Sequence, residues 1–163
     1  MAATKKLETK KMINIEVHKM KIITLKGERH AGKTTTIRKV YQTLWYDEKN
    51  TVRIAFETDG GDKCDFISIL NWKNKIIVIK SLGDAGRKND FSWIKNGWEI
   101  ANAVNADVLL NALDTDDLDE KKYCDYIKPN IPIFIPIEKK ETVEEMALQE
   151  ETVCKQILDE LEK

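Results

Sequence analysis

Cysteine is scarce in this sequence. The three cysteines, Cys64, Cys124 and Cys154, lie far apart and form neither a C-x-x-C pair nor a cluster with histidine. An odd and scattered set of this kind predicts neither a disulfide framework nor a zinc site. We therefore expect three reduced thiols in a cytoplasmic protein.

The sequence also lacks a long apolar run and an excess of charge of one sign. No apolar stretch approaches the roughly 20 residues that a membrane-spanning helix needs, and the Lys-rich beginning has no apolar segment of the secretory type. The net charge is −1, whereas nucleic-acid binding usually requires a basic excess. We expect neither a membrane nor a nucleic acid as a partner.

The length of 163 residues predicts a single domain over residues 1–163. A chain of this length can bury an ordinary hydrophobic core. Residues 1–11 are polar and rich in lysine, so we interpret them as a flexible terminus.

Strand-like and helix-like patterns alternate along the chain. Residues 21–26 form a short apolar run that ends at Gly27, which is typical of a buried strand. Residues 34–46 carry apolar side chains at helical spacing, which predicts an amphipathic helix. Further strands are predicted at residues 51–57, 66–72, 76–79, from 107 and at 131–137. Residues 12–17 form a possible edge strand. Two more helices are predicted, one from Asn89 or Asp90 to about Asn105 and one from Thr142 to the end.

Two local signals refine this order. Only residues 73–75 separate the runs at 66–72 and 76–79, which predicts a hairpin, and Thr142 with Glu145 matches a helix capping box. Pro132 and Pro136 restrict the run at 131–137 to an edge or short strand. The whole order predicts an α/β fold, a three-layer α/β/α sandwich with a mainly parallel sheet.

Residues 27–34 read GERHAGKT and match G-x-x-x-x-G-K-[ST] at every position. The predicted buried strand precedes this loop and the predicted helix follows it, as the motif requires. We expect the loop to bind the phosphates of a nucleotide through the motif residues and the one that follows them, Gly27, Glu28, Arg29, His30, Ala31, Gly32, Lys33, Thr34 and Thr35.

Each part of the motif has a physical role in phosphate binding. Gly27 and Gly32 allow turns at which a Cβ would clash, and successive backbone N–H groups then form an anion-binding nest. The N-terminus of the following helix adds its partial positive charge. Lys33 supplies a full positive charge at the β- and γ-phosphates, and Thr34 offers its hydroxyl to Mg²⁺.

Over residues 21–46 the chain resembles the P-loop NTPase superfamily. This resemblance implies a P-loop type of α/β fold, a nucleoside triphosphate such as ATP as the ligand, and Mg²⁺. The superfamily comprises kinases, GTPases, and motor and transport ATPases. The loop alone does not choose among them.

Mg²⁺ also needs a carboxylate near the phosphates. Asp84 follows the apolar run at residues 76–79, so we predict it as the chief metal-side acid, together with Thr34. This prediction takes the run to lie next to the P-loop strand. Asp59, after the run at 51–57, is the competing candidate, because small-molecule kinases of the superfamily often have a substrate-binding acid there. Both aspartates can also be explained as ordinary turn residues.

Base specificity is less clear from the sequence. Residues 111–114 read NALD, whereas the guanine-reading motif of GTPases has lysine at the second position, so we expect adenine rather than guanine. Trp93 and Trp98 can be interpreted as base-stacking residues or, more simply, as core residues of a helix.

Three functions fit these observations. The leading hypothesis is an ATP-binding P-loop enzyme that hydrolyses ATP or transfers its γ-phosphoryl group, with Lys33 as the catalytic residue. The second is a GTPase-like nucleotide switch with slow turnover. The third is a partner-binding module that uses its C-terminal helix and binds nucleotide only structurally.

Overall fold

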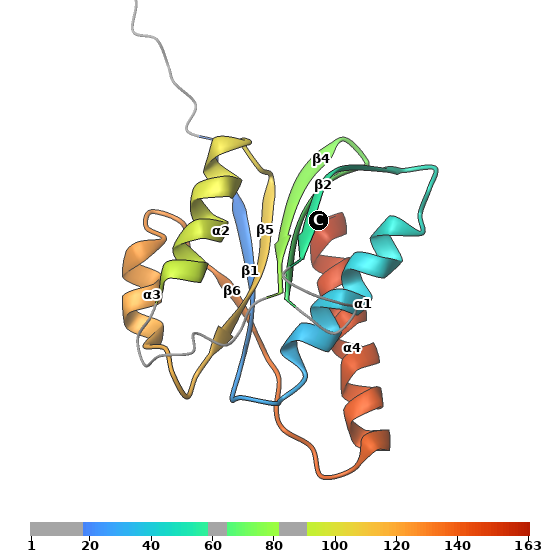
Figure 1. The fold of residues 1–163 in the computed structure, drawn as a ribbon, viewed down its shortest axis with the longest axis vertical. Helices are drawn as coiled ribbons and strands as arrows, with labels where there is room; N and C mark the ends of the chain where they lie inside the picture. The colour runs from blue at the N-terminus through green and yellow to red at the C-terminus, as the bar shows by residue number, and fades with distance from the viewer. Residues whose placement is uncertain (1–17, 59–64, 82–90) are drawn as a thin grey trace, which may run out of the picture.

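Six strands and four helices make up the described part of the chain, so the protein is of the α/β class (Figure 1). The computed structural model describes residues 18–58, 65–81 and 91–163. In chain order the elements are β1 (Lys21–Gly27), α1 (Lys33–Trp45), β2 (Thr51–Thr58), β3 (Phe66–Trp72), β4 (Lys75–Lys80), α2 (Ser92–Ala103), β5 (Val108–Asp114), α3 (Glu120–Tyr126), β6 (Ile133–Pro136) and α4 (Val143–Glu162).

The strands form one mixed sheet in the order β2-β3-β4-β5-β1-β6. β4, β5, β1 and β6 run parallel, whereas β3 pairs antiparallel with both β2 and β4. The expected α/β class is confirmed, but the sheet is less uniformly parallel than expected. The reason is that β2, β3 and β4 follow one another as antiparallel neighbours, without a crossover helix between them.

The predicted hairpin is present between β3 and β4. Its two turn residues, Lys73 and Asn74, have φ angles of 50° and 64°. A two-residue turn with both φ angles positive matches the twist of the flanking strands.

Helices cover both faces of the sheet (Figure 1). One hydrophobic core contains Ile37 of α1 and Ile157 of α4, and a second core on the other face contains Ile94 of α2 and Tyr123 of α3. β5 is buried at every position, as a parallel strand covered on both faces should be. Two separate cores therefore hold the sheet in the middle of the molecule.

The other predicted elements agree with the structure at most positions. α1 begins one residue earlier than expected, and β6 is an edge strand. The capping box of α4 is present: Thr142 Oγ1 accepts from the Glu145 amide at 3.2 Å, and Glu145 Oε2 accepts from the Thr142 amide at 3.3 Å. The sequence pattern did not predict α3. The predictions for residues 12–17 and for a helix cap at Asn89 or Asp90 fall outside the described residues.

Among the described helices, none combines the length and apolar character that a membrane crossing requires.

Buried hydrogen bonds connect β1, β5 and α3. Thr24 Oγ1 donates to Asn111 Oδ1 at 2.7 Å and lies 2.6 Å from Tyr123 Oη, and Asn111 Nδ2 donates to Tyr123 Oη at 3.1 Å. Burial raises the pKa of Tyr123 to about 12, although its bonds to Thr24 and Asn111 act in the opposite direction. This network holds α3 on the sheet and gives Asn111 a structural role.

We expect Tyr123→Phe to lower the free energy of unfolding by about 1–3 kcal/mol at pH 8, because two buried polar groups lose a partner. The pKa of Tyr123 is about 12 in the folded state and about 10 when unfolded. The unfolded chain therefore loses this proton first as the pH rises, so wild type loses about 1.4 kcal/mol relative to the variant by pH 11. Denaturant unfolding at pH 8, 10 and 11 measures this difference.

The matched control is Tyr46→Phe, because Tyr46 is 74% exposed. We expect no change in stability from this control at pH 8. A Tyr123→Phe variant as stable as wild type, or a stability difference that stays constant between pH 8 and pH 11, would contradict the role assigned to the network.

Candidate functional site

The loop that matches the phosphate-binding motif connects β1 to α1 at one edge of the sheet. Its first glycine is required by close packing, since a Cβ on Gly27 would lie 2.2 Å from the Ile137 carbonyl oxygen. Gly32 has a φ of 94° and immediately precedes α1, which begins at Lys33. His30 also has a positive φ, of 63°. The loop thus makes a tight turn that leads directly into the first residue of α1.

Hydrogen bonds within the loop stabilise this turn. The Ala31 amide donates to the Glu28 carbonyl at 3.3 Å, and the Thr36 amide donates to the Gly32 carbonyl at 3.0 Å. Ala31 is fully buried, whereas Glu28 and His30 are exposed. A cavity of about 350 Å³ lies over the loop and is lined by Arg29, His30, Gly32, Lys33, Thr34, Thr35, Asp65, Asp114 and Met146.

Lys33 is the buried cation of this cavity. Its side chain is 5% exposed, and its ammonium group donates to the carbonyl oxygens of Gly27, at 2.8 Å, and of Glu28. Lys33 Nζ also lies 3.8 Å from Asp114 Oδ2. The side chain is therefore folded back over its own loop, with its charge at the base of the cavity.

Asp114 is a second buried charge that the sequence did not assign to the site. It is the last residue of β5, the strand next to β1, and it lies opposite Gly27 in the strand register. Burial raises the pKa of Asp114, and the carboxylates of Asp116 and Asp117 act in the same direction, while the Asp116 amide and the Lys33 ammonium oppose the shift. The sequence did contain a signal that could have identified Asp114, because this residue ends an apolar strand.

Thr34 lies beside another carboxylate, that of Asp65. Thr34 Oγ1 is 3.3 Å from Asp65 Oδ1 and 3.2 Å from the carbonyl oxygen of Ser81, to either of which it can donate. Ser81 Oγ is 3.1 Å from the same carboxylate oxygen. Asp65 immediately precedes β3, and the β3–β4 hairpin brings the start of β3 next to Ser81, after the end of β4. The hairpin prediction could have identified Asp65 on this basis.

Asp84 and Asp59, the two acids that the sequence favoured for this role, lie outside the described residues. The strand before Asp84 is nevertheless described, and its expected position was wrong. β4 pairs with β5 rather than with β1, so one strand separates it from β1, the strand that precedes the loop. Local apolar character predicted that β4 is buried but carried no information on its neighbour.

Arg29 contacts the segment after β5. Its amide donates to Asp116 Oδ2 at 2.9 Å, and its guanidinium forms an ion pair with Asp117. Thr35, at the start of α1, is exposed. These contacts connect the exposed side of the loop to the acidic segment between β5 and α3.

Side-chain oxygens of Thr34 and Asp65 lie together at the edge of this cavity. No group of three or more His, Cys, Asp or Glu side chains able to hold a metal ion is found in residues 18–58, 65–81 and 91–163. The Thr34 hydroxyl and the Asp65 carboxylate are oxygen donors of the kind that Mg²⁺ prefers when phosphates and water supply its remaining ligands.

Comparison with known proteins identifies no similar protein: no protein-family model, curated protein or solved structure gives a significant match to this chain.

Proposed function

We propose that this chain is a P-loop NTPase that binds a nucleoside triphosphate, ATP in the first place, and hydrolyses it or transfers its γ-phosphoryl group. The observation that carries this proposal is the position of Lys33. Its buried ammonium group lies at the start of a helix, under a cavity formed by the loop that matches the phosphate-binding motif. ATP and Mg²⁺ are both supplied by the cytoplasm, the compartment that we expect for this protein.

The fold is compatible with this proposal. Helices on both faces of a sheet with four parallel neighbouring strands support a three-layer α/β/α sandwich of the P-loop type. In such sheets, ligands bind outside the carboxyl ends of the parallel strands. β1, β4 and β5 all end at the edge where the loop lies. β2 and β3, which pair antiparallel with each other, extend the sheet beyond β4.

In the proposed complex, Lys33 exchanges its two carbonyl partners for oxygens of the β- and γ-phosphates. A charge-assisted bond to phosphate is stronger than a bond to a neutral carbonyl. The partial positive charge at the N-terminus of α1 acts on the same phosphates. Lys33 then stabilises the charge that develops on the γ-phosphoryl group during transfer, which is the main requirement of this chemistry.

Thr34 and Asp65 would hold the metal. Bound Mg²⁺ would neutralise part of the negative charge on the β- and γ-phosphates. Thr34 offers its hydroxyl oxygen as a ligand, and Asp65, 3.3 Å from that oxygen, accepts from metal-bound water or binds directly. Asp84 stays a predicted second carboxylate of the same site.

The test compares three substitutions, Asp65→Asn, Asp84→Asn and Asp159→Asn, by titrating ATP with Mg²⁺ and with EDTA. We expect Asp65→Asn to lower the affinity measured with Mg²⁺ by about tenfold or more, about 1.4 kcal/mol. We expect a much smaller change with EDTA, because the lost carboxylate acts through the metal. Asp159 is exposed on α4, so its substitution is the matched control.

The outcome separates the two metal-side candidates. If Asp84→Asn alone removes the Mg²⁺ dependence, then Asp65 has been assigned wrongly and the original sequence prediction is correct. If none of the variants changes the Mg²⁺ dependence, neither Asp65 nor Asp84 holds the metal.

A further inference from the structure

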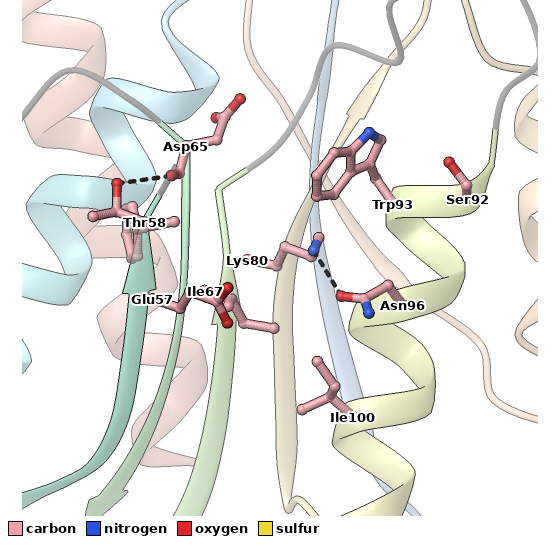
Figure 2. A pocket seen from close by; sticks show the side chains of 10 residues that line it. Glu57, Thr58, Asp65, Ile67, Lys80, Ser92, Trp93, Asn96 and Ile100 are labelled. Atoms are coloured by element: carbon pink, nitrogen blue, oxygen red, sulfur yellow. Dashed lines mark hydrogen bonds between the residues drawn. The ribbon is translucent and has the colours of Figure 1, made fainter. Parts of the chain in front are cut away.

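A second cavity, of about 440 Å³, opens at the same edge of the sheet between the β2–β3–β4 strands and α2 (Figure 2). Its lining residues are Glu57, Thr58, Asp65, Phe66, Ile67, Lys80, Ser92, Trp93, Asn96 and Ile100. The volume lies in the range of about 300–1,000 Å³ that is usual for small-molecule sites. The site derived above shares only Asp65 with this cavity.

Asp65 lines both cavities. Its carboxylate is 3.3 Å from the Thr34 hydroxyl of the phosphate loop, and its backbone carbonyl accepts from Thr58 Oγ1 at 3.1 Å on the side of the second cavity. The two cavities therefore lie next to each other. A ligand in the second cavity would lie close to the terminal phosphate of a triphosphate held by the loop.

A buried cation lies inside the second cavity. Lys80, at the end of β4, is 6% exposed. Its ammonium group donates to Asn96 Oδ1 at 3.0 Å and lies 4.9 Å from the centre of the Trp93 ring. Figure 2 shows Lys80 directed from β4 toward α2, with Trp93 and Asn96 beside its ammonium group. These contacts fix one hydrogen-bonding wall of the cavity.

The remaining walls combine hydrogen-bond acceptors with apolar surface. The carboxylate of Glu57 accepts hydrogen bonds, whereas Lys80 and the amide of Asn96 donate them. Trp93 is 46% exposed and offers a flat ring. Trp98, by contrast, packs against the core under α2, so the two tryptophans of this helix have different environments.

This lining favours a neutral molecule with several hydroxyl groups on a ring. Among the described lining residues, the negative charge of Glu57 balances the positive charge of Lys80, so this lining has no excess positive charge that would attract an anion. Hydroxyl groups can donate to the Glu57 carboxylate and accept from Lys80 and Asn96. The apolar face of a sugar or nucleoside can pack on Trp93, since aromatic rings combine a large apolar surface with fixed geometry.

We propose that this cavity binds a sugar or a ribonucleoside as the phosphoryl acceptor, which makes the protein a small-molecule kinase; this inference rests on the proposed function. An acceptor hydroxyl oxygen forms a bond to the γ-phosphorus of ATP, and the bond from that phosphorus to the β,γ-bridging oxygen breaks. The electron pair leaves with ADP, and the hydroxyl proton passes to water. Trp93 and Asn96 position the acceptor, and Lys80 binds it.

The experiment measures transfer of label from γ-³²P-ATP with Mg²⁺ to D-ribose, D-glucose or uridine, using the full chain. We expect at least one of the three to be phosphorylated faster than ATP is hydrolysed. Trp93→Ala and Asn96→Ala should each raise the KM for that acceptor by at least tenfold and leave the affinity for ATP within twofold of wild type. Circular dichroism checks the fold of both variants.

Asn102→Ala is the matched control, because Asn102 is exposed on the same helix and does not line the cavity. We expect this control to keep the wild-type KM. If ATP binds but none of the three acceptors is labelled, the inference is overturned while the P-loop proposal stands. Wild-type KM values in Trp93→Ala and Asn96→Ala would also overturn it, because the acceptor would then bind elsewhere. Failure of wild type to bind any triphosphate would instead overturn the proposed function, and this inference with it.

Discussion

Replacing Lys33 with alanine is expected to lower the affinity for a nucleoside triphosphate by at least about 100-fold, or about 2.7 kcal/mol. Among the described residues that line the loop cavity, Lys33 at the start of α1 and Arg29 in the loop before it carry full positive charges, and of these two only Lys33 is buried. Bonds between a charged donor and phosphate contribute more than neutral ones, and Lys33 is placed to make two. Titration of ATP with Mg²⁺ measures the loss.

The fold should survive this substitution. Asp114 loses its neighbouring ammonium group, but its carboxylate keeps the hydrogen bond from the Asp116 amide at 3.0 Å. Circular dichroism should therefore match that of wild type. Lys39→Ala is the control on the same helix, because Lys39 is partly exposed and pairs only weakly with Glu150 at 3.7 Å. Equal ATP affinity in folded Lys33→Ala and in Lys39→Ala would contradict the role of Lys33.

Gly27→Ala is expected to have the largest effect on stability, a loss of about 3 kcal/mol or more in the free energy of unfolding. The added Cβ would lie 2.2 Å from the Ile137 carbonyl oxygen and 2.9 Å from the Ile137 Cγ2 atom. The carbonyl belongs to the main chain, which follows β6 and donates its own Ile137 amide to the Lys26 carbonyl at 2.9 Å. Relief of the clash therefore requires β1 and the segment after β6 to separate.

Thermal or denaturant unfolding measures this loss. Gly97→Ala is a matched substitution, because its added methyl group meets carbons of the Lys80 side chain rather than a main-chain atom. We expect a smaller loss there, since a side chain can shift more easily than a backbone. A Gly27→Ala protein that unfolds at the wild-type denaturant concentration would show that the close packing at Gly27 does not constrain the loop.

The local parts of the fold were predictable from the sequence. The strand, loop and helix over residues 21–46 are adjacent in the chain, and each has its own pattern of apolar residues or glycine. The β3–β4 hairpin and the capping box of Thr142 and Glu145 are equally local. Short-range patterns are sufficient for such features because the interacting residues are only a few positions apart.

The features that could not be predicted from the sequence depend on contacts between residues that are far apart in the chain. β1 pairs with β5, more than 80 positions further along, and no local pattern specifies that neighbour. α3 has seven residues and only one of them, Tyr123, is buried, so its apolar periodicity is too short to detect. Asp65 and Asp114 enter the site through the β3–β4 hairpin and the β1–β5 register. The sequence therefore pointed to acids that follow the runs at 76–79 and 51–57, Asp84 and Asp59, and not to Asp65 or Asp114.

The measurement that tests the central claim most directly is calorimetric titration of the wild-type chain with ATP and with GTP, in Mg²⁺ and in EDTA. Our account predicts saturable binding of one triphosphate per chain, with ATP preferred, an affinity that increases on addition of Mg²⁺, and loss of binding in Lys33→Ala. Binding of neither nucleotide at millimolar concentration by folded wild-type protein would contradict it.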